Sequence, residues 1–201
     1  MAGTTGSGTG GMVGMPAGDG PPGGPAADPA VRPARDSDAE DVHRLSAEIQ
    51  AYHAAARPEL FRPEGNDTLE EIRDRMARLD HFYWVAVQDG AVVGYAYARA
   101  DEQPASRHRR AQRVLELRQM GVTARSRRSG VGRSLWAAVR GAAEALGVDR
   151  VVLNVWGFNR PARAFYESLG FGPFRMQMAL EMARHADPAD LRAAREAPGG
   201  E

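Results

Sequence analysis

The sequence contains no cysteine, which excludes disulfides, thiolate metal sites and a cysteine nucleophile. It carries no net charge, because 26 basic residues balance 26 acidic ones, whereas a general nucleic-acid binder is expected to have a basic excess. No apolar run reaches the length of a membrane span, and the first residues lack the cationic start and apolar stretch of a secretion signal. We therefore expect a cytoplasmic protein that binds neither nucleic acid nor a membrane.

Length and composition allow one buried core. The 201 residues are 43% hydrophobic, which suffices for one core and not for two. Residues 1–30 are rich in Gly, Pro, Ser, Thr and Ala, a composition typical of a disordered tail. The alternative is an over-extended start, with initiation at Met12 or Met15. We expect one ordered domain at residues 31–183 and a polar tail at residues 184–201.

Capping boxes and turn signals predict a series of helices and strands. Ser37 with Glu40 and Thr68 with Glu71 form two capping boxes, and Asp89-Gly90 is a tight-hairpin signal. The expected elements are a strand near Val31, a helix from Ser37 to Arg57, a helix from Thr68 to Leu79, strands at 82–87, 91–98 and 113–122, a helix ending at Gly147, a strand at 150–156, a helix at 161–170 and a strand at 174–182. This order predicts an α/β fold with a mixed sheet and helices on both faces.

The chain is organised around residues 113–135. Apolar side chains occupy odd positions at Leu115 and Leu117 and then even positions at Met120 and Val122. A period of two that slips by one residue predicts a β-bulge, which bends a strand and frees backbone groups from pairing.

The turn that follows this strand is suited to an anion. Gly130 and Gly132 open a helix, whose first N–H groups are unpaired and carry partial positive charge. Arginines surround the turn at positions Arg125, Arg127, Arg128 and Arg133. The spacing does not fit a P-loop or the dinucleotide fingerprint, but it fits [QR]-x-x-G-x-[GA] at Arg127, Gly130 and Gly132. We interpret the turn as a diphosphate site.

A second motif makes the first one specific. Asn159, Ala162 and the run from Phe165 to Phe171 match N-x-x-A-x-x-[FL]-Y-x-x-x-G-F, one helix and one strand downstream. With both motifs the chain resembles the GNAT superfamily of acetyl-CoA-dependent N-acetyltransferases. The resemblance implies a mostly antiparallel sheet with one splayed parallel strand pair. It also implies acetyl-CoA as co-substrate, with no metal, bound by Met120, Val122, Arg127, Arg128, Ser129, Gly130, Val131, Gly132, Arg133, Ser134 and Asn159.

Two side chains are candidates for acid–base chemistry. Tyr166 stands where the family signature has the acid that protonates the departing thiolate, although it can also be a buried tyrosine packed beside Phe165. Glu116 resembles the strand glutamate of some members that deprotonate the amine, although it can also pair with Arg113 or Arg118 on a solvated face. Both interpretations of each residue stay open at this point. Asn159 likewise has a helix-capping alternative to a cofactor contact.

The acceptor side is less defined. In the family, the connection between the first two helices borders the acceptor site, so the resemblance makes Tyr52, His53, Phe61 and Arg62 candidates; the alternative places Tyr52 in the core and the others on the surface. We expect an N-acetyltransferase, monomeric or homodimeric, that uses direct attack of a primary amine of a small molecule or protein in a ternary complex. The competing hypothesis is a catalytically silent acyl-CoA-binding or sensing module with the same fold.

Overall fold

The structure is a computed structural model that describes residues 29–180. The predicted polar tail at 184–201 and nearly all of the predicted N-terminal tail lie outside these residues. The chain divides into two compact units, one ending at Asn154 and the other starting at Val155, and each is described by itself.

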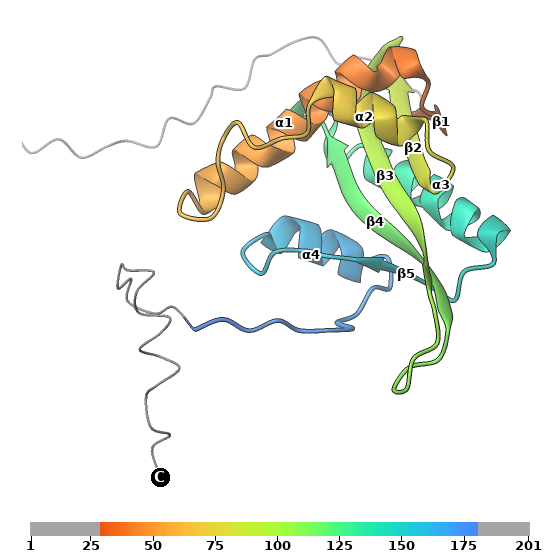
Figure 1. The fold of residues 1–201 in the computed structure, drawn as a ribbon. Helices are drawn as coiled ribbons and strands as arrows, with labels where there is room; N and C mark the ends of the chain where they lie inside the picture. The colour runs from red at the N-terminus through yellow and green to blue at the C-terminus, as the bar shows by residue number, and fades with distance from the viewer. Residues whose placement is uncertain (1–28, 181–201) are drawn as a thin grey trace, which may run out of the picture. The chain divides into compact units, whose positions relative to one another are not determined.

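The first unit contains a five-stranded sheet (Figure 1). Its strands follow chain order across the sheet: β1 (Ala30–Pro33), β2 (His81–Gln88), β3 (Ala91–Gln103), β4 (Gln112–Val122) and β5 (Arg150–Leu153). Neighbours are antiparallel from β1 to β4, whereas β4 and β5 are parallel. This confirms the predicted mixed sheet, mostly antiparallel with one parallel pair.

Helices cover both faces of the sheet, with α1 (Ala39–Ala56) and α2 (Leu69–Met76) on one face and α3 (Val131–Leu146) on the other (Figure 1). Two glycines mark these faces. A Cβ at Gly94 would lie 3.1 Å from Val131 of α3, whereas a Cβ at Gly121 would lie 2.9 Å from Ile49 of α1. Both helices therefore approach the sheet so closely that a side chain at either glycine would displace them.

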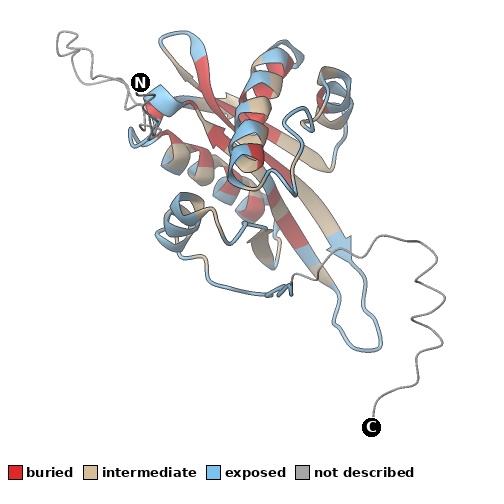
Figure 2. Cartoon of the chain, turned by 90° about the vertical axis from the view of Figure 1, so that its left-hand side faces the viewer, coloured by how far each residue is buried: buried red, intermediate tan, exposed pale blue. Residues whose placement is uncertain are grey.

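The buried residues line the inner surfaces of the helices and the middle of the sheet (Figure 2). Under α1 and α2 the core includes Leu45, Ile72 and Tyr95, and α3 contributes Leu135 and Val139, all at most 1% exposed. These side chains explain the helical spacing of apolar residues, since each helix turns one apolar stripe toward the sheet.

Three local predictions are confirmed: the capping box at Thr68, the hairpin turn at Asp89-Gly90 and the helix end at Gly147. At the start of α2 the Glu71 carboxylate accepts from the Thr68 amide at 2.7 Å, and Thr68 Oγ1 accepts from the Glu71 amide at 3.2 Å. Asp89 and Gly90 both have positive φ, at 49° and 76°, as a two-residue hairpin turn requires. Gly147 ends α3 with φ of 59°.

Two element predictions were wrong at the ends of the chain's regular structure. The predicted box at Ser37 does not form, because α1 begins at Ala39 and Asp38 instead accepts hydrogen bonds from Arg32 and from the Arg35 amide. Residues 174–180 form no strand, and Phe174 is 72% exposed. Alternating apolar residues do not make a strand without a neighbour to pair with. Strand β5 is also shorter than expected and ends at Leu153.

The second unit contains α4 (Arg160–Glu167). Its first turn holds the predicted proline, Pro161, and the Asn159 side chain accepts from the Ala162 amide at 3.2 Å. The capping interpretation of Asn159 is therefore confirmed.

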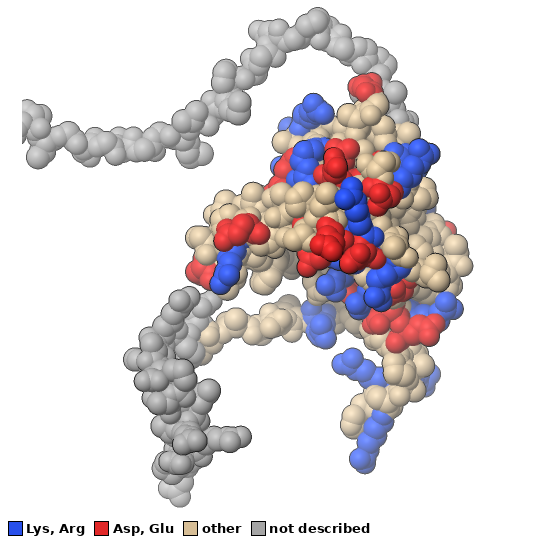
Figure 3. All heavy atoms as spheres, turned by 45° about the horizontal axis from the view of Figure 1, so that its top comes forward, with Lys and Arg blue, Asp and Glu red and all other residues tan. Residues whose placement is uncertain are grey.

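Basic and acidic side chains are interspersed over the face shown in Figure 3. The basic run 107–110 lies in the loop between β3 and β4 and is exposed, in line with a solvated loop. Within residues 29–180 no helix combines the length and apolarity needed to cross a membrane.

Candidate functional site

The predicted bulge lies in the middle of β4. Tyr97 pairs with Gln119 and Ala98 pairs with Leu117, so Arg118 is the extra residue. Because of this residue Leu117 and Met120 share one face of the sheet, while Glu116 and Gln119 share the other.

Beyond the bulge, β4 loses one of its neighbours. The parallel register with β5 ends at the pair Leu117 and Leu153, whereas the pairing with β3 continues to Val122. Among the described residues, the segment that holds Met120 and Val122 thus pairs on one side only, which leaves backbone groups free for a ligand.

The turn between β4 and α3 presents unpaired amides. Gly130 has φ of 89° and Arg128 has φ of 64°, so the chain reverses sharply before α3 begins at Val131. The Gly130 carbonyl accepts from the Arg133 and Ser134 amides, but no described residue accepts from the amides of Gly130, Val131 or Gly132. These three N–H groups at a helix start suit a phosphate.

Side chains at the turn are partly held in place. The Ser129 hydroxyl donates to the Ser126 carbonyl at 2.8 Å, and Arg127 Nε donates to the Val122 carbonyl at 3.3 Å. Arg128 is exposed on the same turn. Buried Thr123 Oγ1, where β4 ends, has no hydrogen-bond partner among the described residues. The unpaired amides and the guanidinium groups of the turn together fit a diphosphate ligand such as that of coenzyme A.

Glu116 lies on β4 on the face that carries α1 and α2. One carboxylate oxygen accepts from Arg118 at 3.0 Å and the other from Asn154 at 3.1 Å. Arg113, the other partner considered, lies 3.6 Å from Glu102 instead. An ionised carboxylate has about four lone-pair sites, so Glu116 retains acceptor capacity for a proton or a water.

Tyr166 belongs to the second unit. Its ring makes edge contacts with Phe165 and Phe171, at centroid distances of 5.4 and 5.7 Å. Burial raises the pKa of Tyr166 to about 12, so the phenol is protonated at neutral pH. Glu116 and the turn both belong to the first unit, Glu116 on β4 and the turn between β4 and α3, whereas the relation of Tyr166 and Asn159 to them stays a prediction.

The acceptor candidates at the end of α1 form an aromatic cluster. The His53 ring lies 5.9 Å from that of Tyr52 and 5.2 Å from that of Phe61, and burial lowers the pKa of His53. Tyr52 is 42% exposed, so it is not a core residue. Arg62 is exposed, and its carbonyl accepts from Gln50 at 2.6 Å.

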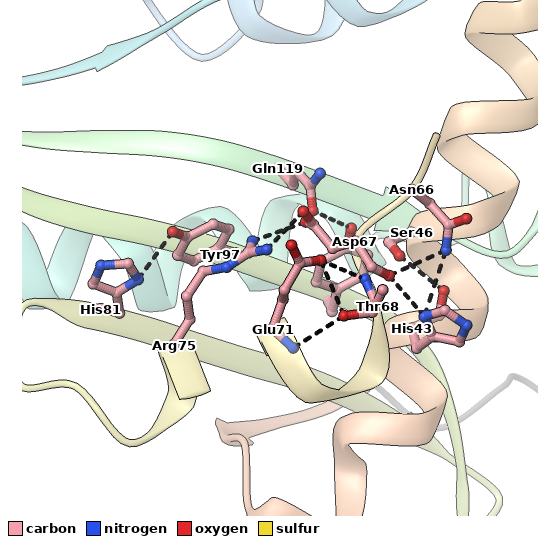
Figure 4. A network of polar contacts seen from close by, with 11 residues as sticks. His43, Ser46, Asn66, Asp67, Thr68, Glu71, Arg75, His81, Tyr97 and Gln119 are labelled. Atoms are coloured by element: carbon pink, nitrogen blue, oxygen red, sulfur yellow. Dashed lines mark hydrogen bonds and ion pairs between the residues drawn. The ribbon is translucent and has the colours of Figure 1, made fainter. Parts of the chain in front are cut away.

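The sequence analysis missed a polar pocket on the same sheet face as Glu116. We call it the arginine pocket; it measures about 400 Å³ and is lined by Arg75, Arg99, Arg118, Asp67, His81, Tyr97 and Gln119. Figure 4 shows most of these side chains between α2 and the sheet. The sequence offered one indication of it. Tyr95, Tyr97 and Arg99 occupy alternate positions of β3 and so share one face of the sheet, and a charged residue is unusual on a face that is buried.

Comparison of sequences places this geometry in a family. A family model described as the acetyltransferase (GNAT) family matches residues 47–171. N-acetylaspartate synthetase of Homo sapiens is 37% identical over 89 residues, which cover 44% of this chain and 27% of that protein. Mycothiol acetyltransferase of Amycolatopsis mediterranei is 31% identical over 142 residues, which cover 69% of this chain and 44% of that protein. The chain thus spans less than half the length of these curated relatives.

Solved structures share the fold. A mutant BH1408 protein from Bacillus halodurans has a TM-score of 0.73 at 24% identity, covering 77% of this chain and 99% of that one. An aminoglycoside N-acetyltransferase, AAC(6')-Iy, in complex with CoA has a TM-score of 0.61 at 17% identity, covering 77% and 94%. The sheet with its single parallel pair, the glycine turn before α3 and the match over residues 47–171 lead to one conclusion: the chain belongs to the GNAT family of acetyltransferases.

Proposed function

We propose that the protein is an N-acetyltransferase that transfers the acetyl group of acetyl-CoA to a primary amine by direct attack in a ternary complex. The observation that carries the proposal is the set of unpaired amides at Gly130, Val131 and Gly132, in the turn that follows β4, whose last residues no longer pair with β5. Coenzyme A supplies an activated thioester, and its diphosphate matches these donors and the arginines of the turn.

Each step of the transfer has a residue assigned to it. Glu116 takes a proton from the incoming ammonium group, so that the neutral nitrogen can form the new C–N bond. Backbone groups at Met120 and Val122 orient the acetyl and pantetheine groups and stabilise the oxyanion. Tyr166 donates its proton to the sulfur as the C–S bond breaks, and its phenolate takes up the second proton that the nitrogen loses as the amide forms, while Glu116 returns the first proton to water. The products are an N-acetyl amide and the free thiol of coenzyme A.

The relatives do not identify the acceptor. Their names point to different molecules, since an N-acetylaspartate synthetase and a mycothiol acetyltransferase are both among them. The acceptor class therefore has to be inferred from this chain's own pocket.

Thiol release in the presence of acetyl-CoA and a panel of amines tests the proposal. We expect coenzyme binding together with amine-dependent release of free thiol. Coenzyme binding without thiol release on any amine would instead support the silent sensing module, and absence of coenzyme binding would contradict both.

A further inference from the structure

The arginine pocket contains one cation without a carboxylate partner. Arg75 binds both oxygens of Asp67, at 2.6 and 2.8 Å, and Arg118 is engaged by Glu116 at 3.0 Å. Arg99 forms no ion pair within residues 29–180. The pocket therefore offers one guanidinium group to an anionic ligand.

His81 lies in the same pocket, and both its burial and the arginines around it lower its pKa. Burial lowers the pKa of His81; Asp80 opposes the shift, but Arg78, Arg99 and Arg75 lower the pKa further. A neutral His81 adds no cation of its own, and its Nδ1 lies 3.0 Å from the Tyr97 hydroxyl. The charge available to a ligand is thus that of the arginine.

Gln119 adds a second hydrogen-bond donor to the pocket that Arg99 lines. The Tyr95 hydroxyl donates to Gln119 Oε1 at 2.9 Å, which leaves the amide nitrogen of Gln119 as a donor toward the pocket that this residue lines. A guanidinium fork and an amide NH₂ are the groups that bind carboxylate oxygens.

The register of the sheet places this donor set beside the candidate base. Arg99 of β3 pairs directly with Glu116 of β4, and such cross-strand neighbours have Cβ atoms about 5 Å apart. A ligand that carries its anion and its amine only a few bonds apart can therefore offer the anion to Arg99 and the amine to Glu116. The volume of about 400 Å³ is also suited to a small molecule.

We propose that the acceptor is a small amino acid whose carboxylate binds Arg99 and Gln119 while its amino group faces Glu116. This inference rests on the proposed acetyltransferase function and adds the substrate class to it. A polycationic amine fits the pocket poorly, because the guanidinium groups would repel it.

Three matched sets of acceptors test the inference. The first set contains α-amino acids and β-alanine, the second contains the primary carboxamides of the same compounds, and the third contains the amines that remain after their decarboxylation. Thiol release should show kcat/KM values roughly tenfold to a hundredfold higher for the carboxylates, the range expected when one charged hydrogen bond is lost. Replacing Arg99 by Gln should remove this preference, mainly through KM, and leave coenzyme affinity unchanged. Arg73→Gln is the matched control, since Arg73 lies on exposed α2 surface and pairs with Asp36.

Binding of the same amino acids to the coenzyme A complex, measured by calorimetry, separates the inference from the proposed function. Arg99-dependent binding without any transfer would uphold the pocket and contradict the acetyltransferase. Transfer with equal kcat/KM for carboxylates and carboxamides, or unchanged in Arg99→Gln, would overturn the amino-acid acceptor and leave the acetyltransferase standing.

Discussion

The glycine turn before α3 and the arginine pocket adjoin the same strand, β4, but they are built from different parts of the chain. In the turn the donors are backbone amides of consecutive residues, Gly130 to Gly132. In the pocket they are side chains from α2, β2, β3 and β4, brought together across the sheet. A backbone site depends on local conformation, whereas a side-chain site depends on which residues the fold juxtaposes. Substitutions should therefore affect the two regions in different ways.

Gly130→Asp should have the largest effect and should act on the turn alone. Within residues 29–180 no atom lies within 4 Å of a Cβ at this position, so the penalty comes from φ of 89° and from charge repulsion of the diphosphate. We expect coenzyme affinity to fall at least roughly a hundredfold, measured by titration with coenzyme A, because charged hydrogen bonds contribute about 1.5–3 kcal/mol each.

Gly147→Asp is the matched control for that variant. Gly147 also has positive φ, at 59°, and also has no atoms within 4 Å of a Cβ, but it lies at the other end of α3. It should share the backbone strain and keep coenzyme affinity. Equal losses of affinity in the two variants would refute the assignment of the turn.

Tyr166→Phe should lower turnover by roughly a hundredfold or more, as expected for loss of a general acid, with coenzyme affinity nearly intact. The substitution removes only the hydroxyl and keeps the ring contacts with Phe165 and Phe171. Steady-state rates and coenzyme titration measure the two quantities. Unchanged turnover would show that Tyr166 is only a packed aromatic residue.

Glu116→Gln sharpens the comparison, because Glu116 lies on β4, the strand that both regions adjoin. We expect kcat to fall by roughly tenfold to a hundredfold at neutral pH, with much of the loss recovered at high pH, where the amine arrives neutral. A rate–pH profile measures this recovery. A uniform loss at every pH would indicate that Glu116 only positions Arg118 and Asn154.

Asp38→Asn should have the smallest effect on activity and should alter stability instead. The Arg32 guanidinium holds the pKa of Asp38 below its usual value, so this pair stabilises the fold at neutral pH. That stability is lost as pH falls from the ordinary aspartate range through the lowered pKa. We expect the free energy of unfolding at pH 7 to fall by about 1–3 kcal/mol, as measured by urea denaturation. A change in kcat/KM under conditions where the variant is fully folded would contradict the view that Asp38 affects neither the turn nor the arginine pocket.

The sequence could predict the turn, which depends on neighbouring residues, but not the arginine pocket, which depends on residues far apart in the chain. The slip in apolar period before Met120 predicts the bulge, and Gly130 and Gly147 predict the limits of α3, because these signals act within a few residues. The arginine pocket could not be read in this way. In the described part of the chain Arg99 has no carboxylate partner, because Asp67, from a loop, pairs with Arg75 and Glu116, from the neighbouring strand, pairs with Arg118.

The errors have the same origin. The capping box predicted at Ser37 does not form, because Asp38 pairs with Arg32, six residues earlier in the chain. The apolar residues that alternate at 174–180 form no strand, because no strand among the described residues pairs with them. Exposure of Tyr52 likewise depends on how α1 docks, which its helical spacing does not specify.

The coenzyme site is tested most directly by following the amide resonances of Gly130, Val131 and Gly132 by NMR during titration with coenzyme A. We expect these three amides to shift together, to saturate with one equivalent of coenzyme, and to do so equally in Arg99→Gln. Saturable coenzyme binding that leaves all three resonances unmoved would contradict the assignment of this site.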